Sequence, residues 1–255
     1  MSGPGAPVTG SGHAPEVWRD RVASTPRLSV PDLHALVPGR DRLLVLSAHP
    51  DDESIGAGRL LSAWRRGGGR AQAVVATAGE ACFDQVGTRP EGLAVRRLLE
   101  WRRALAVVDV EPGEAYGLPD GGLEEAEAAL ADAVARSVAD AAPAGELVLL
   151  APHPGDPHPD HRAVGRAAAG IGARLDIPVW FFRIWLTYWS DPAVDLGGRL
   201  VTVEVDEVDD VAWDTAVGCF RSQLEPFAPG QGAVVPAPML VHHDRQLLVL
   251  PGGAP

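Results

Sequence analysis

The 255-residue chain contains no lysine and no asparagine, and it has only two cysteines, Cys82 and Cys219. Two cysteines are too few for the disulfide framework of a small secreted protein, and they do not form a Cys-x-x-Cys pair. We therefore expect two free thiols in a reducing compartment. The absence of lysine and asparagine, together with the abundance of alanine and glycine, indicates a bias in composition rather than a function.

The sequence also lacks an apolar run long enough to span a bilayer, and its first residues lack the basic and apolar regions of a secretory signal. These absences favour a cytoplasmic protein. The formal net charge is −12, and a nucleic acid backbone or an anionic membrane surface would repel that excess of negative charge. We therefore expect neither partner and interpret the acidity as an aid to solubility.

The chain is long enough for one α/β domain with a full hydrophobic core. Residues 1–14 are rich in glycine, proline and serine, and we expect them to be disordered. Residues 15–40 have some amphipathic character around Trp18 and Leu33 and predict an N-terminal extension that lies on the domain surface. Residues 41–255 are expected to form a single domain.

Apolar runs and helical apolar spacing alternate along this domain. Strands are predicted at 43–48, 71–77, 114–118, 146–151, 178–184, 199–205 (as an edge strand) and 247–250. Helices are predicted at 55–66, 90–108, 123–141, 161–175 and 208–223. The alternation predicts a Rossmann-like three-layer α/β fold, with a mostly parallel sheet and helices on both faces.

Ligands of such sheets bind at the carboxyl ends of the strands, so we examined the loops after Ala48, Thr77 and Ala151. The first of these loops lies in AHPDDE, which places one imidazole and three carboxylates within residues 48–53, around Pro50. The loop after Ala151 adds five further groups that can bind a metal: His153, Asp156, His158, Asp160 and His161. Histidine and carboxylate ligands on a rigid scaffold suit a divalent metal, with zinc as the leading candidate.

Each cluster has a plainer interpretation when it is taken alone. An isolated histidine is more often packed or exposed than a ligand, and two aspartates at a helix start are often only an N-cap. The segment HPDH could likewise be a proline-braced turn before a helix. Two such clusters at two strand ends are not what this interpretation predicts, and the combination favours a metal site.

AHPDDE, followed by TAGE at 77–80 and HPDH at 158–161, resembles the PIG-L or LmbE-like family of zinc deacetylases. Members of that family remove acetyl groups from N-acetylglucosamine units and related amino sugars. The resemblance extends over residues 42–223 and implies an LmbE-like fold. It also implies the ligands of one metal ion, zinc or alternatively Fe(II): His49, Asp52 and His161.

The resemblance further implies the catalytic groups. Asp51 is expected to be the general base, and His158 the oxyanion stabiliser or acid, oriented by Asp160. Three residues are candidate substrate contacts: Glu80, Arg97 and Asp156. For Arg97, a surface salt bridge with Glu100 is an equal alternative, and Glu80 could instead be a helix-cap carboxylate.

Three aromatic residues, Trp185, Tyr188 and Trp189, could stack on a sugar or an aglycone, or they could belong to the core. We expect His242 and His243 to lie on the surface. The thiol of Cys82 follows Glu80 near the expected pocket, but no neighbour in the sequence suggests that it is activated.

The expected function is removal of an N-acyl group, with acetyl the leading choice, from an amino-sugar-containing small molecule or glycoconjugate by a metal-activated water. The substrate would be a small glycoside or an N-acetylated amino sugar. One alternative is a metal-dependent amidase acting on a non-sugar amide, and another is a metal-binding protein without catalysis. A nucleotide-binding Rossmann module needs a glycine-rich turn after the first strand, where this chain has AHPDDE instead.

Overall fold

The computed structural model describes residues 12–84, 87–226, 230 and 232–252. Residues 1–11 of the tail that we expected to be disordered therefore lie outside the described residues. His13, from the same predicted tail, already contacts the rest of the protein, because its backbone N–H donates to the carbonyl of Tyr188 at 2.7 Å.

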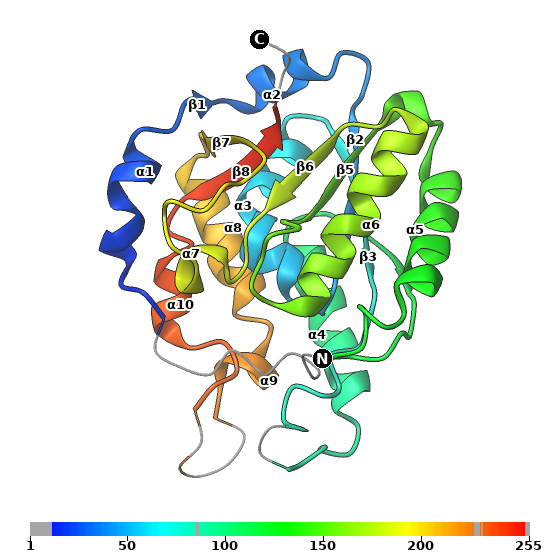
Figure 1. The fold of residues 1–255 in the computed structure, drawn as a ribbon, viewed down its shortest axis with the longest axis vertical. Helices are drawn as coiled ribbons and strands as arrows, with labels where there is room; N and C mark the ends of the chain where they lie inside the picture. Colours follow the sequence, from blue (N-terminus) through cyan, green and yellow to red (C-terminus); the bar gives the residue numbers. More distant parts are fainter. Residues whose placement is uncertain (1–11, 85–86, 227–229, 231, 253–255) are drawn as a thin grey trace.

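One mixed sheet forms the centre of the described part of the chain (Figure 1). Its strands lie in the order β1-β7-β8-β6-β5-β2-β3-β4. All neighbouring pairs are parallel except those of β8, which runs antiparallel to β6 and β7. The strands are β1 (Arg27–Leu28), β2 (Arg42–Ser47), β3 (Arg70–Val75), β4 (Glu111–Ala115), β5 (Leu147–Pro152), β6 (Val179–Phe182), β7 (Gly198–Val203) and β8 (Gln246–Pro251). The predicted mostly parallel sheet is confirmed.

Helices cover both faces of this sheet and complete the predicted three layers (Figure 1). One face carries α2 (Val30–Leu36), α3 (Asp52–Arg66), α4 (Leu93–Val107) and α8 (Glu207–Val217). The other face carries α5 (Glu127–Ala141) and α6 (Pro159–Leu175). The shorter helices are η1 (Pro15–Trp18), α1 (Arg19–Ala23), η3 (Ala144–Glu146), α7 (Leu186–Trp189), α9 (Arg221–Leu224) and α10 (Ala237–Val241).

The apolar run in β2 illustrates why the central strands are continuous rather than alternating in polarity. Leu43 and Val45 belong to the core cluster on one face of the sheet, whereas Leu44 and Leu46 belong to the cluster on the other face. Successive side chains of a strand point to opposite faces, so a strand covered by helices on both sides must be apolar at every position. Burying each such leucine contributes about 1.5–3 kcal/mol to the free energy of folding.

Three details of the sequence prediction are corrected. The predicted helix at 208–223 is two helices, α8 and α9, separated at 218–220. The predicted N-terminal extension does not simply lie on the surface, because Trp18 and Leu33 are buried and β1 joins the sheet. β7 is consequently not the outermost strand, since β1 pairs with its free edge.

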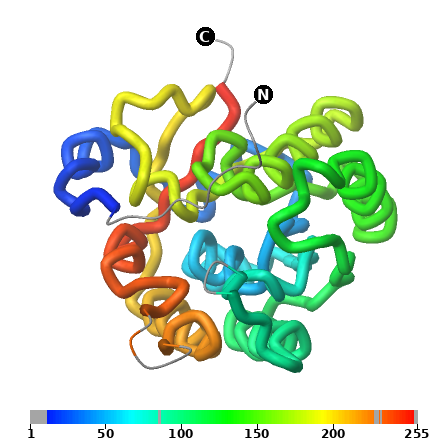
Figure 2. Tube along the Cα trace, turned by 60° about the horizontal axis from the view of Figure 1, so that its bottom comes forward, coloured from blue at the N-terminus to red at the C-terminus, as the bar shows by residue number. Residues whose placement is uncertain are grey.

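The topology brings two loops together at one edge of the sheet. β2 lies between β3 and β5, so the chain leaves β2 toward one side of the sheet and later returns on the other side. The loops that follow β2 and β5 therefore flank the point where the strand order reverses, which is where ligands bind in this class of sheet. Figure 2 shows the protein turned toward that end. In the described part of the chain, no helix combines the length and the apolar character needed to cross a membrane.

Candidate active site

The loop after β2 is folded back on itself by Asp52, the first residue of α3. Asp52 Oδ2 accepts hydrogen bonds from the backbone N–H groups of Ala48 and His49, each at 2.9 Å. The carboxylate is thereby held beside the imidazole that precedes it by three positions. His161 reaches the same place from the first turn of α6, which begins with Pro159 directly after the N-cap His158.

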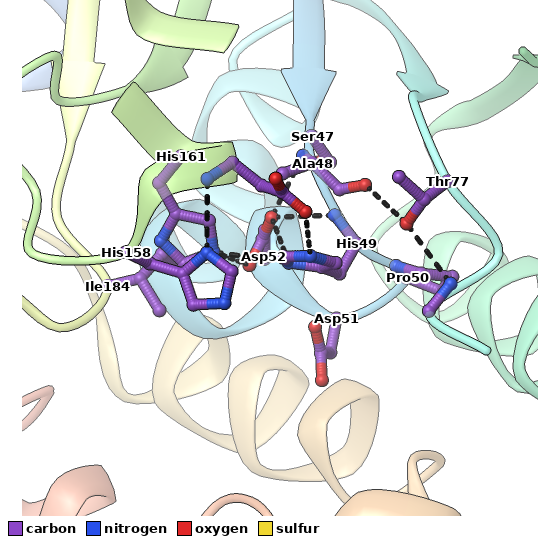
Figure 3. A network of polar contacts seen from close by, with 12 residues as sticks. Ser47, Ala48, His49, Pro50, Asp51, Asp52, Thr77, His158, His161 and Ile184 are labelled. Atoms are coloured by element: carbon purple, nitrogen blue, oxygen red, sulfur yellow. Dashed lines mark hydrogen bonds and ion pairs between the residues drawn. The ribbon is translucent and has the colours of Figure 1, made fainter. Parts of the chain in front are cut away.

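Three side chains, those of His49, Asp52 and His161, converge there, as Figure 3 shows. His161 Nε2 lies 3.1 Å from Asp52 Oδ1, and His49 Nδ1 lies 3.2 Å from His161 Nε2 and 3.7 Å from Asp52 Oδ2. Ligand atoms at 2.0–2.1 Å around a tetrahedral ion are about 3.3–3.4 Å apart. The donor set and its spacing therefore fit a divalent metal ion.

The second nitrogen of each imidazole is held by a carboxylate. His161 Nδ1 lies 3.0 Å from Asp156 Oδ1, and His49 Nε2 lies 3.0 Å from Asp120 Oδ1 and 3.2 Å from Asp160 Oδ2. Metal-binding histidines almost always have such a partner, which fixes the tautomer and the orientation of the ring. This arrangement leaves His49 Nδ1 and His161 Nε2 facing each other and Asp52.

Other combinations of ligands are also close together in the described residues. One group consists of His49, His158 and His161, and a second of His49 with Asp120 and Asp160. Within each group the candidate ligand atoms lie within 4.8 Å of one another. His158 is thus a neighbour of two predicted ligands, with its ring stacked on that of His161 at a centroid distance of 4.6 Å.

The charges around the site are strongly interdependent. Burial by itself lowers the pKa of His161, but the nearby carboxylates of Asp52 and Asp156 outweigh it and raise this pKa to about 9. For Asp52 the balance is reversed, because burial raises its pKa and the attraction of His161 and His49 brings it below its usual range. A metal ligand must be deprotonated, so a bound cation would take the place of the proton that His161 otherwise carries.

Asp51 differs from Asp52 although the two are adjacent. Its backbone has φ 146°, a conformation that is strained for any residue with a Cβ and that is concentrated at functional sites. Figure 3 shows its carboxylate turned away from the cluster around Asp52. Burial raises the pKa of Asp51 to about 6, even though the guanidinium of Arg97 opposes the shift.

Arg97 does not form the surface salt bridge of the alternative prediction, whereas its contact with a substrate stays a prediction. It is 2 % exposed and donates to Asp51 Oδ2 at 3.1 Å and to the carbonyls of Pro50 and Gly79 at 3.0 and 2.8 Å. A Cβ on Gly79, whose φ is 65°, would lie 1.9 Å from this guanidinium, so the approach requires glycine. The alternative partner Glu100 instead binds Arg96 and Ser222. Arg97 therefore holds the expected base and the loop around it.

Asp160 is not bound to the ring of His158 as we expected. Its carboxylate accepts from the backbone N–H groups of Gly121 and Leu123 and contacts His49. Because these partners turn the side chain away from the start of α6, it is the backbone N–H of Asp160 that contacts His158, donating to Nδ1 at 3.2 Å. Burial, reinforced by His161 and His49, lowers the pKa of His158 to about 3.

Of the other two candidate substrate contacts, Asp156 is corrected and Glu80 stays a prediction. Asp156 is fully buried, and both of its oxygens are occupied, one by His161 and the other by the backbone N–H groups of residues 184–186. It cannot reach a ligand and instead orients His161. Glu80 Oε1 accepts a hydrogen bond of 3.4 Å from the backbone N–H of Asp120.

Sequence reasoning missed Asp120, which follows β4 at the same edge of the sheet. Its Oδ1 lies 3.0 Å from His49 Nε2, and its Oδ2 accepts from the backbone N–H of Ala81 at 2.7 Å. Burial raises the pKa of this carboxyl, but His49 brings it below its usual range. Asp120 comes two residues after the predicted strand at 114–118, and the end of that strand was the signal that could have identified the residue.

A cavity of about 850 Å³ opens onto these groups. Among its lining residues are His49, Asp51, Asp52, Arg97, Asp120, His158, His161, Cys82, Gln223, Trp185, Tyr188, Trp189 and 232–236. Trp185 and Tyr188 are at the same time members of the hydrophobic core. The rings therefore pack on the core and also line the cavity, and stacking on a sugar or an aglycone stays a prediction.

His242 and His243 are buried rather than on the surface. His242 Nε2 donates to the carbonyl of His13 at 2.8 Å, and His243 Nε2 to that of Ile184 at 3.1 Å. The thiol of Cys82 has its pKa raised by burial, which agrees with the expectation that it is not activated.

Residues 44–171 match the family model described as PIG-L, GlcNAc-PI de-N-acetylase. The chain belongs to the PIG-L family. The matched residues include AHPDDE, TAGE and HPDH, and the family makes this protein an N-deacetylase, as the sequence predicted. A comparison with curated protein sequences found no match.

Several solved structures have a similar fold. An A40926 pseudoaglycone deacetylase is 19% identical with a TM-score of 0.65, over 83% of this chain and 97% of the other. The zinc-inhibited form of a teicoplanin deacetylase is 19% identical with a TM-score of 0.61, over 72% of this chain and 85% of the other. The 4-carboxy-2-hydroxymuconate hydratase of Pseudomonas putida has a TM-score of 0.52 at 15% identity, over 80% and 82%. Because a hydratase shares the fold, the fold does not select the reaction.

Proposed function

We propose that this member of the PIG-L family removes the acetyl group from an N-acetylated amino sugar within a small glycoside, using one divalent metal ion. The observation that carries the proposal is the pair of adjacent aspartates. Asp52 faces the two imidazoles, whereas Asp51 lines the same cavity with its carboxylate free of that cluster. A site that only stored metal would need no such second carboxylate.

His49, Asp52 and His161 would hold the metal through two nitrogens and one oxygen, a donor set that suits zinc and also Fe(II). Such a cation lowers the pKa of water and polarises an amide carbonyl. The three ligands leave room for a substrate, as a hydrolytic rather than a structural site requires. Zinc is our choice because the ligands are imidazole and carboxylate in a compact tetrahedral spacing.

Asp51 would act as the general base. A base is most effective when its pKa is close to the working pH, and burial brings the pKa of Asp51 to about 6. It would accept the proton of the attacking water and pass it to the amine that leaves. Arg97 would keep the carboxylate in place while this proton is transferred.

His158 would stabilise the oxyanion that develops on the amide oxygen. Its low pKa keeps the ring neutral, and its Nδ1 accepts the N–H of Asp160. The ring proton is therefore on Nε2, so a neutral His158 in the lining of the cavity is a hydrogen-bond donor. Removing one such donor from a hydrolase costs about 10²–10³ in turnover.

A panel of amides tests the proposal. Purified protein loaded with Zn²⁺ is incubated with N-acetylglucosamine glycosides and with non-sugar N-acetyl amides, and released acetate and amine are measured. We expect acetate only from the amino sugars, none after chelation of the metal, and a rate lower by about two to four orders of magnitude in Asp51→Asn. Release from the non-sugar amides alone would favour the alternative amidase, and bound metal without release from any amide would favour a metal-binding protein.

A further inference from the structure

Three aromatic side chains, Trp185, Tyr188 and Trp189, form what we call the aromatic wall of the cavity. All three line the cavity that contains His49 and Asp51. Trp185 and Trp189 are stacked, with 4.3 Å between ring centroids and 17° between ring planes. The ring of Tyr188 lies 5.5 Å from that of Trp189. The wall is therefore a continuous aromatic surface next to the catalytic groups.

Trp189 also carries a polar group. Its indole N–H is buried and has no hydrogen-bond partner among the residues that the structure describes. A buried tryptophan N–H normally has such a partner. Because this N–H is enclosed by the protein, what the wall offers to a ligand in the cavity is the apolar surface of its rings, which suits a ring with an apolar face.

The N-terminal segment 12–21, which we call the brace, holds this wall from outside. The backbone N–H of His13 donates to the carbonyl of Tyr188 at 2.7 Å. Gly12 lies against the ring of Tyr188, because a Cβ at position 12 would be 2.5 Å from three ring atoms. His242 completes the contact, with its ring edge-on to Tyr188 at 5.4 Å and its Nε2 donating to the carbonyl of His13.

The brace also fixes the loop that follows α7. The indole N–H of Trp18 donates to the carbonyl of Ser190 at 3.0 Å, and Trp18 is 2 % exposed. Arg21 donates to the carbonyls of Pro192 and Val194. Figures 1 and 2 both show the N-terminal segment in blue beside the yellow segment that contains this loop.

The start of the wall is held from the inside as well. One oxygen of Asp156 accepts the backbone N–H groups of Ile184, Trp185 and Leu186, at 3.3, 2.9 and 3.2 Å. The wall is therefore fixed on two sides before any ligand arrives. A surface that is ordered in advance loses less conformational entropy when it binds a ligand.

We propose that the aromatic wall is a binding subsite for a second ring of the substrate, the ring attached to the acetamido sugar, and that the brace keeps this subsite in place. The inference rests on the proposed function, since the acetamido group must lie at His49 and Asp51. The cavity of about 850 Å³ is near the upper end of the 300–1,000 Å³ that holds drug-sized ligands, and so has room beyond one sugar. Wall and brace both lie outside the matched residues 44–171.

The occupant that this chemistry recognises is a planar or chair-shaped ring with an apolar face, either a second pyranose or an aryl group. Three substrates separate these sources: N-acetylglucosamine, N,N′-diacetylchitobiose and the phenyl glycoside of N-acetylglucosamine. We expect kcat/KM for acetate release to be about 2- to 12-fold higher for a two-ring substrate, the factor that one aromatic contact provides. A gain for chitobiose alone indicates a sugar ring, and a gain for the phenyl glycoside alone indicates an aryl group.

Variants of the wall and of the brace test the assignment. The quantity compared is the two-ring preference, which is kcat/KM for a two-ring substrate divided by kcat/KM for N-acetylglucosamine. Trp185→Leu should bring the two-ring preference close to one. Trp18→Phe keeps the packing but loses the bond to Ser190, and Gly12→Ala pushes on Tyr188, so both should lower the preference by raising KM for the two-ring substrate. Val17→Ala, at a position 45 % exposed on the same segment, is the matched control and should retain the preference.

The proposal is overturned if wild-type protein shows no two-ring preference, or if Trp185→Leu lowers kcat/KM for all three substrates by the same factor. The proposed role of the brace in positioning the wall is excluded if Trp18→Phe and Gly12→Ala both retain the two-ring preference as Val17→Ala does. If no substrate releases acetate, calorimetry with the same compounds on metal-loaded Asp51→Asn decides. Tighter binding of a two-ring compound that Trp185→Leu removes supports the subsite and places the failure in the reaction, whereas equal binding overturns the subsite.

Discussion

The carboxylate of Asp156 joins the predicted metal ligand His161 to the segment that begins the aromatic wall. Its Oδ1 lies 3.0 Å from His161 Nδ1, while its Oδ2 accepts three backbone N–H groups of residues 184–186. The carboxylate is fully buried, and the attraction of His161 holds its pKa below its usual range against the effect of burial. One side chain thus orients a predicted metal ligand and a wall of the cavity together.

Asp156→Asn should weaken the metal site. An amide has one acceptor oxygen, whereas both His161 and the backbone of residues 184–186 require an acceptor, so one of them loses its partner. Replacing the carboxylate behind a metal-binding histidine typically lowers metal affinity about 10- to 100-fold. Competition with a chelator measures the effect, and Asp132→Asn, at an exposed position on α5, is the control. Wild-type affinity in Asp156→Asn would mean that His161 does not bind the metal.

Substitutions of the two adjacent aspartates should have different effects on metal content and turnover. Asp51→Asn removes a base but no ligand, so we expect full metal content with turnover lowered by about two to four orders of magnitude. Asp52→Asn should lose metal first, because Asp52 contacts both imidazoles. Metal analysis and deacetylation rates on the two proteins provide the measurement. Loss of metal in Asp51→Asn with retention in Asp52→Asn would reverse the roles, and a near-normal rate in Asp51→Asn would transfer the base to another group, with His158 next.

His161→Ala and His158→Ala distinguish the proposed ligand set from the other group of close ligand atoms. We expect His161→Ala to lose the metal when it is purified without added zinc. His158→Ala should keep the metal and lose about 10²–10³ in turnover, as expected for an oxyanion donor. Loss of metal in both variants would favour the group of His49, His158 and His161, and metal content equal to wild type in His161→Ala would remove His161 from the ligand set.

Two neighbouring arginines on α4 provide a matched pair for stability. Arg97→Gln leaves Asp51 without its buried cationic partner, and removing one member of a buried ion pair costs about 3–5 kcal/mol in the free energy of unfolding. Arg96→Gln breaks a pair whose arginine is 55% exposed, and such pairs contribute about 0–1 kcal/mol. Chemical denaturation compares the two variants. Equal destabilisation would show that the Arg97–Asp51 pair does not hold the loop.

Local sequence patterns were sufficient to predict the central strands and part of the candidate site. The apolar run 43–46 predicts a strand covered on both sides, because each residue type is dictated by its own face of the sheet. The family resemblance implied His49 and Asp52 as ligands, and these lie three positions apart in one short segment whose backbone bonds bring them together. The ends of the predicted strands also indicated the edge of the sheet where the candidate site lies, since parallel strands bring their loops to one side.

The partners of the site residues followed only from the tertiary structure. Asp120 meets His49 from a loop 71 positions along the chain, Arg97 meets Asp51 from another helix, and Trp18 reaches the loop after α7 from near the N-terminus. No local pattern encodes such contacts, because a carboxylate or a guanidinium looks the same in the sequence whether it faces water or a buried partner. The sequence determined which groups the site contains, whereas long-range packing decided which of them orient, neutralise or support the others.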